Sequence, residues 1–214
     1  MNGLSIIYYS ACRIHERFAE AVRSELMLST GDQFPIISVT HQPIAFGDRR
    51  IIVGDVPQSI AQVYRNALAG AMAAETAYVA MAEDDTVYAR SHWDHRPADD
   101  EFAYDRNRAV LTRQLSADGR HREALYYFRE RTQMAMLICR RDLLIETLTE
   151  RFARHQNPPL DTNVAKNAGW GEPGRYEKNL KLTPRTRVYF DAPEPSVTVN
   201  HSASLMGRRR VNPD

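Results

Sequence analysis

Apolar residues come in short runs separated by polar segments, the pattern expected of buried strands that alternate with helices and loops. The runs at residues 4–9 and 78–82 are almost continuously apolar or aromatic. Such runs are typical of parallel strands that are covered on both faces. Further strands are expected at residues 35–40, 50–53, 124–128, 133–139, 186–189 and 196–200.

Apolar residues at helical spacing lie between these runs and predict a helix over residues 14–28. Ser59 follows a turn-forming segment and is expected to cap a second helix, over residues 60–74. The alternation of strand and helix predicts an α/β fold with a mostly parallel central sheet flanked by helices. Further helices are expected near residues 99–111 and over 142–154, with a surface turn at 117–122 and a glycine-bearing loop at 167–173.

The composition is that of a soluble globular protein, with 43% hydrophobic and 26% charged residues in a chain of 214. This length fits one domain with a substantial core. The net charge of +1 gives no global field that favours nucleic acid or a membrane. Two cysteines, Cys12 and Cys139, do not form a disulfide framework and are expected to be reduced. No signal peptide or membrane span is recognised, so a cytoplasmic location is expected.

The run at residues 78–82 ends in three adjacent acids, Glu83, Asp84 and Asp85. Ligands of open α/β sheets bind just beyond the carboxyl ends of such strands. Three carboxylates at that place repel one another unless a cation or hydrogen-bond donors neutralise them. Hard oxygen ligands favour Mg²⁺ or Mn²⁺, which commonly share one or two carboxylates with a phosphate. An acidic turn after a strand is the alternative interpretation.

The order of the motifs resembles that of the GT-A glycosyltransferases, especially the family 2 type. Those enzymes have an Arg-Asn pair on the helix before an acidic "DXD" strand end, and here Arg65-Asn66 precedes residues 83–85. The segment Gly169-Trp170-Gly171-Glu172 is similar to their acceptor loop, and His201 to their late metal-binding histidine. The resemblance implies a single Rossmann-like GT-A domain over residues 1–214, with a nucleotide-binding half (1–85), an acceptor half (86–205) and a basic tail (206–214).

A divalent ion bridging the two donor phosphates would neutralise the departing nucleoside diphosphate. Asp85 is the leading candidate for a direct ligand, and His201 would complete the protein's contribution to the site. Glu83 would bind through water or contact the ribose, whereas alternation along an extended segment turns the Asp84 side chain away from its neighbours. A capping or surface role is the alternative for His201.

Family 2 enzymes bind the nucleoside base at the place of the first loop. Tyr9 is expected to stack on a uracil-like ring, and Ser10 or Arg13 to hydrogen-bond the base edge or the phosphate. Arg65 is expected to reach the base or to pair with an acid on a neighbouring element. Arg208, in the run 208–210, is expected to clamp the diphosphate or a polyanionic acceptor. The alternatives are a core position for Tyr9 and solvated positions for the arginines.

Glu172 is the candidate general base of an inverting transfer, in which one carboxylate takes the acceptor hydroxyl proton. Trp170 offers an apolar surface for a sugar ring or an acceptor base. Pro173 stands where related enzymes often have a second acidic residue, so the sequence departs from the family pattern at the residue after this base.

The acceptor is expected from a second resemblance, to small phage glycosyltransferases that modify hydroxymethylated pyrimidines in DNA. Trp93 belongs to a segment that carries this resemblance and is a candidate acceptor contact. Aromatic residues interleaved with arginine, such as Tyr126, Tyr127 and Arg129, also suit DNA. Phage origin would place the protein in the host cytoplasm. The alternatives are a glycosyltransferase acting on a cell-envelope saccharide, a non-catalytic nucleotide-binding protein of the same fold, and a nucleotidyltransferase.

Overall fold

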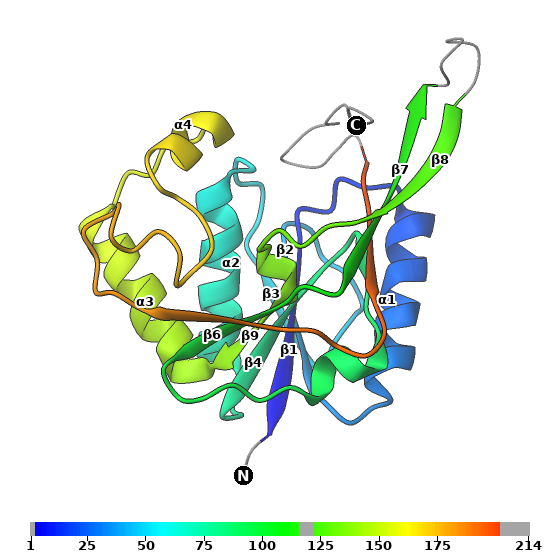
Figure 1. Cartoon of the computed structure of the whole chain (residues 1–214), viewed down its shortest axis with the longest axis horizontal. Helices are drawn as coiled ribbons and strands as arrows, with labels where there is room; N and C mark the ends of the chain where they lie inside the picture. The colour runs from blue at the N-terminus through cyan, green and yellow to red at the C-terminus, as the bar shows by residue number, and fades with distance from the viewer. Residues whose placement is uncertain (1–2, 116–121, 202–214) are drawn as a thin grey trace.

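A seven-stranded sheet forms the centre of the computed structural model, which describes residues 3–115 and 122–201 (Figure 1). Its strand order is β10-β6-β9-β4-β1-β2-β3, and only β9 runs against the common direction. The predicted α/β class with a mostly parallel central sheet is therefore confirmed. The strands are β1 (Leu4–Ser10), β2 (Ile36–Thr40), β3 (Arg49–Ile52), β4 (Tyr78–Glu83), β6 (Glu101–Asp105), β9 (Leu137–Arg140) and β10 (Thr186–Phe190).

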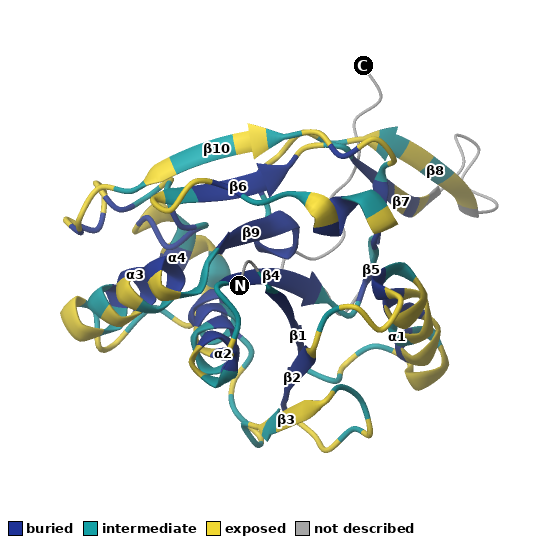
Figure 2. Ribbon diagram, turned by 90° about the horizontal axis from the view of Figure 1, so that it is seen from below, coloured by how far each residue is buried: buried dark blue, intermediate teal, exposed yellow. Residues whose placement is uncertain are grey.

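Helices cover both faces of this sheet, and β1 is buried along its whole length (Figure 2). Alternate residues of a strand point to opposite faces. Ile7 and Tyr9 therefore belong to the core beneath α2 (Ile60–Ala73) and α3 (Arg141–Arg154), whereas Ile6 and Tyr8 belong to the core beneath α1 (Glu16–Thr30). None of the helices in the described residues combines the length and apolar character of a membrane span.

Helix α2 is fixed at its start and against the sheet. The Ser59 hydroxyl accepts a hydrogen bond from the Gln62 amide at 3.1 Å, which confirms the predicted N-cap. Further along, Gly70 lets the helix approach β1 closely, because a Cβ at this position would lie 2.3 Å from Cγ2 of Ile7. The first turn of α2 is thereby held near the carboxyl ends of β1 and β4.

The prediction of a helix near residues 99–111 is wrong. This part of the chain forms β6 and β7 (Arg108–Leu115), preceded by a 3₁₀ helix, η1 (Arg90–Asp94). Phe102 and Tyr104 are completely buried on one face of β6, which pairs with both β9 and β10. Pairing with distant strands, rather than local helical spacing, decides this conformation.

Two smaller differences concern residues 133–139 and 162–167. The strand expected at 133–139 starts only at β9, after a short 3₁₀ turn, η2 (Met134–Met136). Helix α4 (Thr162–Asn167) was not predicted, although the Asp161 side chain caps it by accepting from the amides of Asn163 and Val164.

A second sheet has the order β5-β11-β7-β8 and lies beside the carboxyl end of β4. It adds β5 (Thr86–Val87), β8 (Arg122–Phe128) and β11 (Ser196–Val199). The β7–β8 ribbon extends away from the body of the molecule (Figure 1). The strands predicted at 124–128, 186–189 and 196–200 are confirmed, while the turn predicted at 117–122 lies almost entirely outside the described residues.

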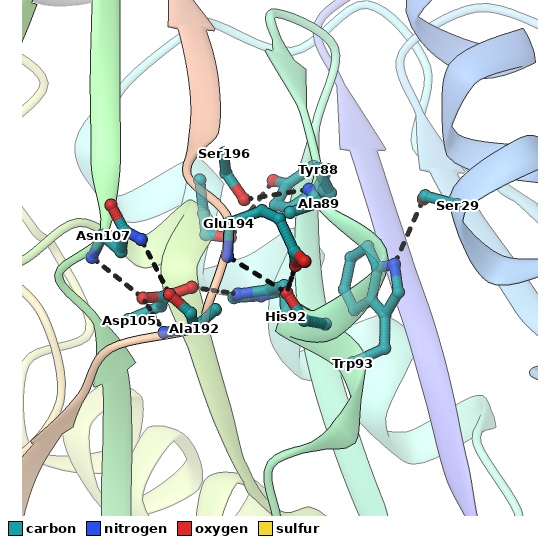
Figure 3. Close-up of polar contacts among 12 residues, drawn as sticks. Ser29, Tyr88, Ala89, His92, Trp93, Asp105, Asn107, Ala192, Glu194 and Ser196 are labelled. Carbon is teal, nitrogen blue, oxygen red and sulfur yellow. Dashed lines mark hydrogen bonds and ion pairs between the residues drawn. The ribbon is translucent and has the colours of Figure 1, made fainter.

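A buried hydrogen bond links the end of β6 to η1 (Figure 3). The Asp105 carboxylate, at the end of β6, accepts from Nδ1 of His92 at 2.9 Å, and both side chains are completely buried. Its other oxygen accepts from the amides of Asn107 at 2.9 Å and Ala192 at 3.1 Å. One carboxylate thus holds η1, the start of β7 and the segment that leads into β11.

Replacement of the Asp105 carboxylate should therefore lower the stability of the fold. Asp105→Asn puts an amide NH₂ among donors and leaves a buried donor unpaired, so the free energy of unfolding should fall by about 3 kcal/mol in urea denaturation. Asp191→Asn is the matched control, because Asp191 is exposed and pairs with Arg106 at 2.7 Å. It should change stability by less than about 1 kcal/mol. Equal effects of the two substitutions would contradict the joining role of Asp105.

Candidate active site

The acid cluster is built where β1 and β4 end side by side. These strands are parallel neighbours, and Tyr9 lies opposite Glu83 in their register. The Tyr9 hydroxyl donates to Oε1 of Glu83 at 2.6 Å, and the Ser10 hydroxyl donates to the Asp84 carboxylate. Residues of the first strand therefore fix the first two acids of the cluster.

Asp85 is held by one distant residue, His201, and by its neighbour in the chain, Thr86. Nε2 of His201, which follows β11, lies 3.3 Å from Oδ2 of Asp85. The Thr86 hydroxyl donates to Oδ1 of Asp85 at 3.0 Å. The side-chain amide of Gln133 donates to Oε2 of Glu83 at 3.2 Å, which completes the surroundings of the cluster.

Burial and mutual repulsion make these acids difficult to ionise together. Burial, with the nearby Asp85 charge as the second cause, raises the pKa of Glu83 to about 8 and that of Asp84 to about 6. The hydrogen bond to Asp85 raises the pKa of His201. A positive charge placed among the three carboxylates would favour their ionised forms, so the cluster is electrostatically suited to a cation.

The cluster opens into a cleft of about 470 Å³. Most of the predicted site residues line it, namely Tyr9, Ser10, Arg13, Glu83, Asp84, Asp85, Trp170, Glu172 and His201. Acids at the strand ends and the predicted acceptor loop, which are far apart in the sequence, therefore face the same space.

The predicted acceptor loop, residues 169–172, is fixed by a buried arginine on α3. Arg151 is completely buried, and its Nη1 donates to the Gly171 carbonyl at 2.8 Å while Nη2 donates to Oε1 of Glu177 at 3.1 Å. A Cβ on Gly171 would lie 2.1 Å from the Tyr176 ring, so only glycine fits at this position. These contacts place Glu172, the next residue, at the cleft wall.

Two of the predicted residues that the structure describes, Arg65 and Trp93, do not line the cleft. Arg65 is exposed on α2, with its guanidinium 4.3 Å from the ring centre of Phe152. Trp93 is completely buried beneath α1 and donates to the Ser29 hydroxyl at 3.1 Å (Figure 3). It packs in the core because η1 inserts there, so it offers no surface to an acceptor. Arg208 lies outside the described residues.

Tyr9 reaches the cleft only with the edge of a buried ring. Its side chain is 5% exposed and belongs to the core, and its hydroxyl is occupied by Glu83. The structure therefore shows the core position that was the alternative for this residue, combined with a direct role in holding an acid. Stacking of a base on Tyr9 remains a prediction.

The donor groups fit a divalent ion as a two-residue set. No group of three or more His, Cys, Asp or Glu side chains that could hold a metal ion occurs within residues 3–115 and 122–201. Asp85 and His201 nevertheless bring a carboxylate oxygen and an imidazole nitrogen together at the cleft. Mg²⁺ and Mn²⁺ are commonly bound by few protein ligands, with phosphate oxygens and water filling the other positions.

Sequence reasoning did not assign Gln133 and Thr198 to the site, although both line the cleft. Arg108 also lines it, although the sequence predicted only a general affinity for DNA at this residue. Arg129 also lines it, although only a general affinity for DNA was predicted for its segment. The sequence signal that could have indicated the position of Arg129 is the alternating pattern of residues 124–128, which predicts a strand. That pattern does not identify the partner strand, and the partner decides which side chains reach the cleft.

No protein-family model and no curated protein matches this sequence. Among solved structures, the chain is similar to a glycosyltransferase involved in the glycosylation of the major capsid of PBCV-1. The two are 10% identical, the alignment covers 88% of this chain and 82% of that chain, and the TM-score is 0.46. A nucleotidyl transferase from Methanothermobacter is 14% identical, with 91% and 89% covered and a TM-score of 0.46. A 2-C-methyl-D-erythritol 4-phosphate cytidylyltransferase from Thermus thermophilus is 11% identical, with 94% and 95% covered and a TM-score of 0.44. At these values the similarity identifies neither the family nor the function of this chain.

Glu83 should make stability depend on pH. Because its pKa is raised from 4.5 to about 8 on folding, the folded state holds more protons than the unfolded state between these values, and the free energy of unfolding falls as the pH rises through this window. In a chelating buffer, the protein should be at least about 2 kcal/mol more stable at pH 5 than at pH 8.

Glu83→Gln should remove most of this difference in urea denaturation, because glutamine does not titrate. Glu20→Gln, on the exposed face of α1, is the control and should retain it. The same slope in Glu83→Gln and in the unsubstituted protein would show that the buried carboxyl does not cause the pH dependence.

Proposed function

We propose that the protein is a metal-dependent glycosyltransferase that moves a sugar from a nucleotide diphosphate-sugar, such as a UDP-sugar, to a hydroxyl acceptor with inversion. The observation that carries this proposal is the acid cluster at the ends of β1 and β4, which faces the same cleft as Glu172. Binding of a nucleotide alone would not require a carboxylate fixed on the acceptor side. The acid cluster, which favours a cation, and Glu172, the candidate base, line the same cleft. This arrangement is the one that transfer of a sugar from a diphosphate requires.

On the donor side, Asp85 and His201 would hold Mn²⁺ or Mg²⁺, which supplies charge neutralisation of the departing diphosphate when bound. Glu83, fixed by Tyr9 and Gln133, would contact the ribose or bind the ion through water. Arg13 is exposed at the rim of the cleft, where its guanidinium would orient the nucleotide.

On the acceptor side, Glu172 would take the proton of the acceptor hydroxyl while that oxygen attacks the anomeric carbon. The bond from the anomeric carbon to the diphosphate oxygen breaks on the opposite face, and the bonding electrons leave with the nucleoside diphosphate. Trp170 lines the cleft beside Glu172 and would pack against a sugar ring. Arg151 holds the carbonyl of the residue between them.

For the acceptor we propose a hydroxymethylpyrimidine base in DNA, and the exposed face of the β7–β8 ribbon favours it. Tyr126 and Phe128 are 54% and 62% exposed on β8, with ring centres 5.6 Å apart. Aromatic side chains stack on nucleic-acid bases without regard to sequence, and a two-stranded ribbon fits the DNA major groove. A saccharide hydroxyl is the alternative acceptor.

Asp85→Ala tests the donor side. With Mn²⁺, labelled UDP-sugars and either hydroxymethylpyrimidine DNA or an oligosaccharide, the unsubstituted protein should transfer sugar, detected by mass spectrometry of the digested product. Asp85→Ala should lower kcat at least about 100-fold, because charge neutralisation at the diphosphate is lost. Asp99→Ala, an exposed acid paired with Arg140 at 3.6 Å, should retain activity. Transfer that survives both Asp85→Ala and a chelator would contradict the metal assignment.

Glu172→Gln tests the base. It should reduce kcat by about 100-fold to 10,000-fold, the usual contribution of general base catalysis, while the dissociation constant of UDP in calorimetry stays unchanged. Glu146→Gln is the control, because Glu146 pairs with Arg185 on the outer surface at 2.7 Å. Full turnover by Glu172→Gln would assign the base to another residue.

A further inference from the structure

Two arginines lie directly opposite each other at the base of the β7–β8 ribbon. The Arg129 amide donates to the Arg108 carbonyl at 2.9 Å, next to the paired residues Ala109 and Phe128. Opposite residues of an antiparallel pair point to the same face, with Cβ atoms about 5 Å apart. Both arginines line the cleft that contains the acid cluster. Like charges at such positions destabilise a sheet unless something compensates them.

Hydrogen bonds with the described residues satisfy these guanidinium groups only in part, although the charges of Glu83 and Asp85 act favourably on Arg108. Arg108 is 2% exposed, and its guanidinium makes one hydrogen bond, from Nη1 to the Thr198 hydroxyl at 3.3 Å. Its Nε is buried and has no hydrogen-bond partner within residues 3–115 and 122–201. The Arg129 side chain is half-buried and forms no hydrogen bond or ion pair with the described part of the chain. Burial, followed by the charge of Arg129, lowers the pKa of Arg108.

A directed chain of hydroxyls connects Arg108 to the acid cluster. The Thr86 hydroxyl has one proton, which it donates to Asp85 at 3.0 Å. The 3.0 Å contact between the hydroxyls of Thr198 and Thr86 must then have Thr198 as its donor. Thr198 is left to accept from Arg108. The guanidinium is therefore held two hydroxyls away from the candidate metal ligand, Asp85.

We propose that Arg108 and Arg129 form a phosphoryl-binding site, whose ligand is the diphosphate of the nucleotide-sugar donor. A guanidinium presents paired N–H donors that match phosphate oxygens, and an anion between two arginines removes their repulsion. The hydroxyl chain holds Arg108 two hydroxyls from Asp85, and Arg129 lines the same cleft, so one diphosphate would lie between the arginines and the acid cluster. The identity of this ligand rests on the proposed function, whereas the arrangement of the arginines does not. A phosphate group on the acceptor has the same chemistry and is the other source to test.

Calorimetry with inorganic pyrophosphate, UDP and uridine, each with Mn²⁺, tests the site. Arg129→Gln should weaken binding of pyrophosphate and UDP about tenfold or more, the usual effect of losing a hydrogen bond to a charged group, and should change uridine binding less than about twofold. Arg108→Lys keeps the positive charge but loses the paired N–H donors of the guanidinium, so it should weaken binding of pyrophosphate and UDP. Arg106→Gln, whose arginine is outside the cleft and pairs with Asp191, is the matched control.

The outcomes separate this proposal from the proposed function. Because Arg129 is half-buried, its substitution tests the site even when Arg108→Lys fails to fold. Unchanged affinities for pyrophosphate and UDP in Arg129→Gln would overturn the proposal, and so would equal losses for uridine. Unchanged UDP affinity with a raised KM for a phosphate-bearing acceptor would assign the site to the acceptor and overturn the donor assignment. The expected loss of UDP affinity in a protein that transfers no sugar would support the phosphoryl site and contradict the transferase.

Discussion

Three carboxylates share one poorly hydrated volume because β1 and β4 end side by side, and much of the site compensates for that crowding. Glu83 and Asp84 are held by hydroxyls from the first strand, and Asp85 lies against His201. Hydrogen bonds from neutral donors reduce the repulsion but add no positive charge. The cleft therefore combines a deficit of positive charge at the acids with an excess of it at the ribbon, and a cation together with a diphosphate would satisfy both.

The sheet around this cluster could be predicted because its signals are local. The continuous apolar runs of β1 and β4 are long enough to predict strands covered on both faces. Serine is a preferred N-cap residue, and Ser59 directly precedes α2. The acids at the end of β4 are visible because three adjacent carboxylates after an apolar run are unusual. Parallel alignment of the strands then brings Tyr9 to Glu83, since the carboxyl ends of such strands meet at one edge.

The conformation of the chain after residue 86 was harder to predict from the sequence, because it depends on contacts between distant segments. Residues 101–115 contain apolar positions that also suit a helix, and only pairing with β9, β10 and β8 makes them strands. Trp93 was expected at the acceptor and lies in the core, since nothing in its segment shows which side of η1 faces α1. Arg151 and Arg108 look like ordinary surface arginines in the sequence. Their burial is decided by the loops and strands that close over them.

The acid cluster joins residues that are made at very different times during synthesis. Tyr9 and Ser10 leave the ribosome early, whereas His201 follows almost two hundred residues later. A nascent chain can pair β1 with β4 and bury the acids well before their histidine neighbour is available. The growing polypeptide would therefore pass through a stage in which the sheet is formed but the proposed ion site still lacks its histidine, and the site would be completed only after residue 201 has left the ribosome.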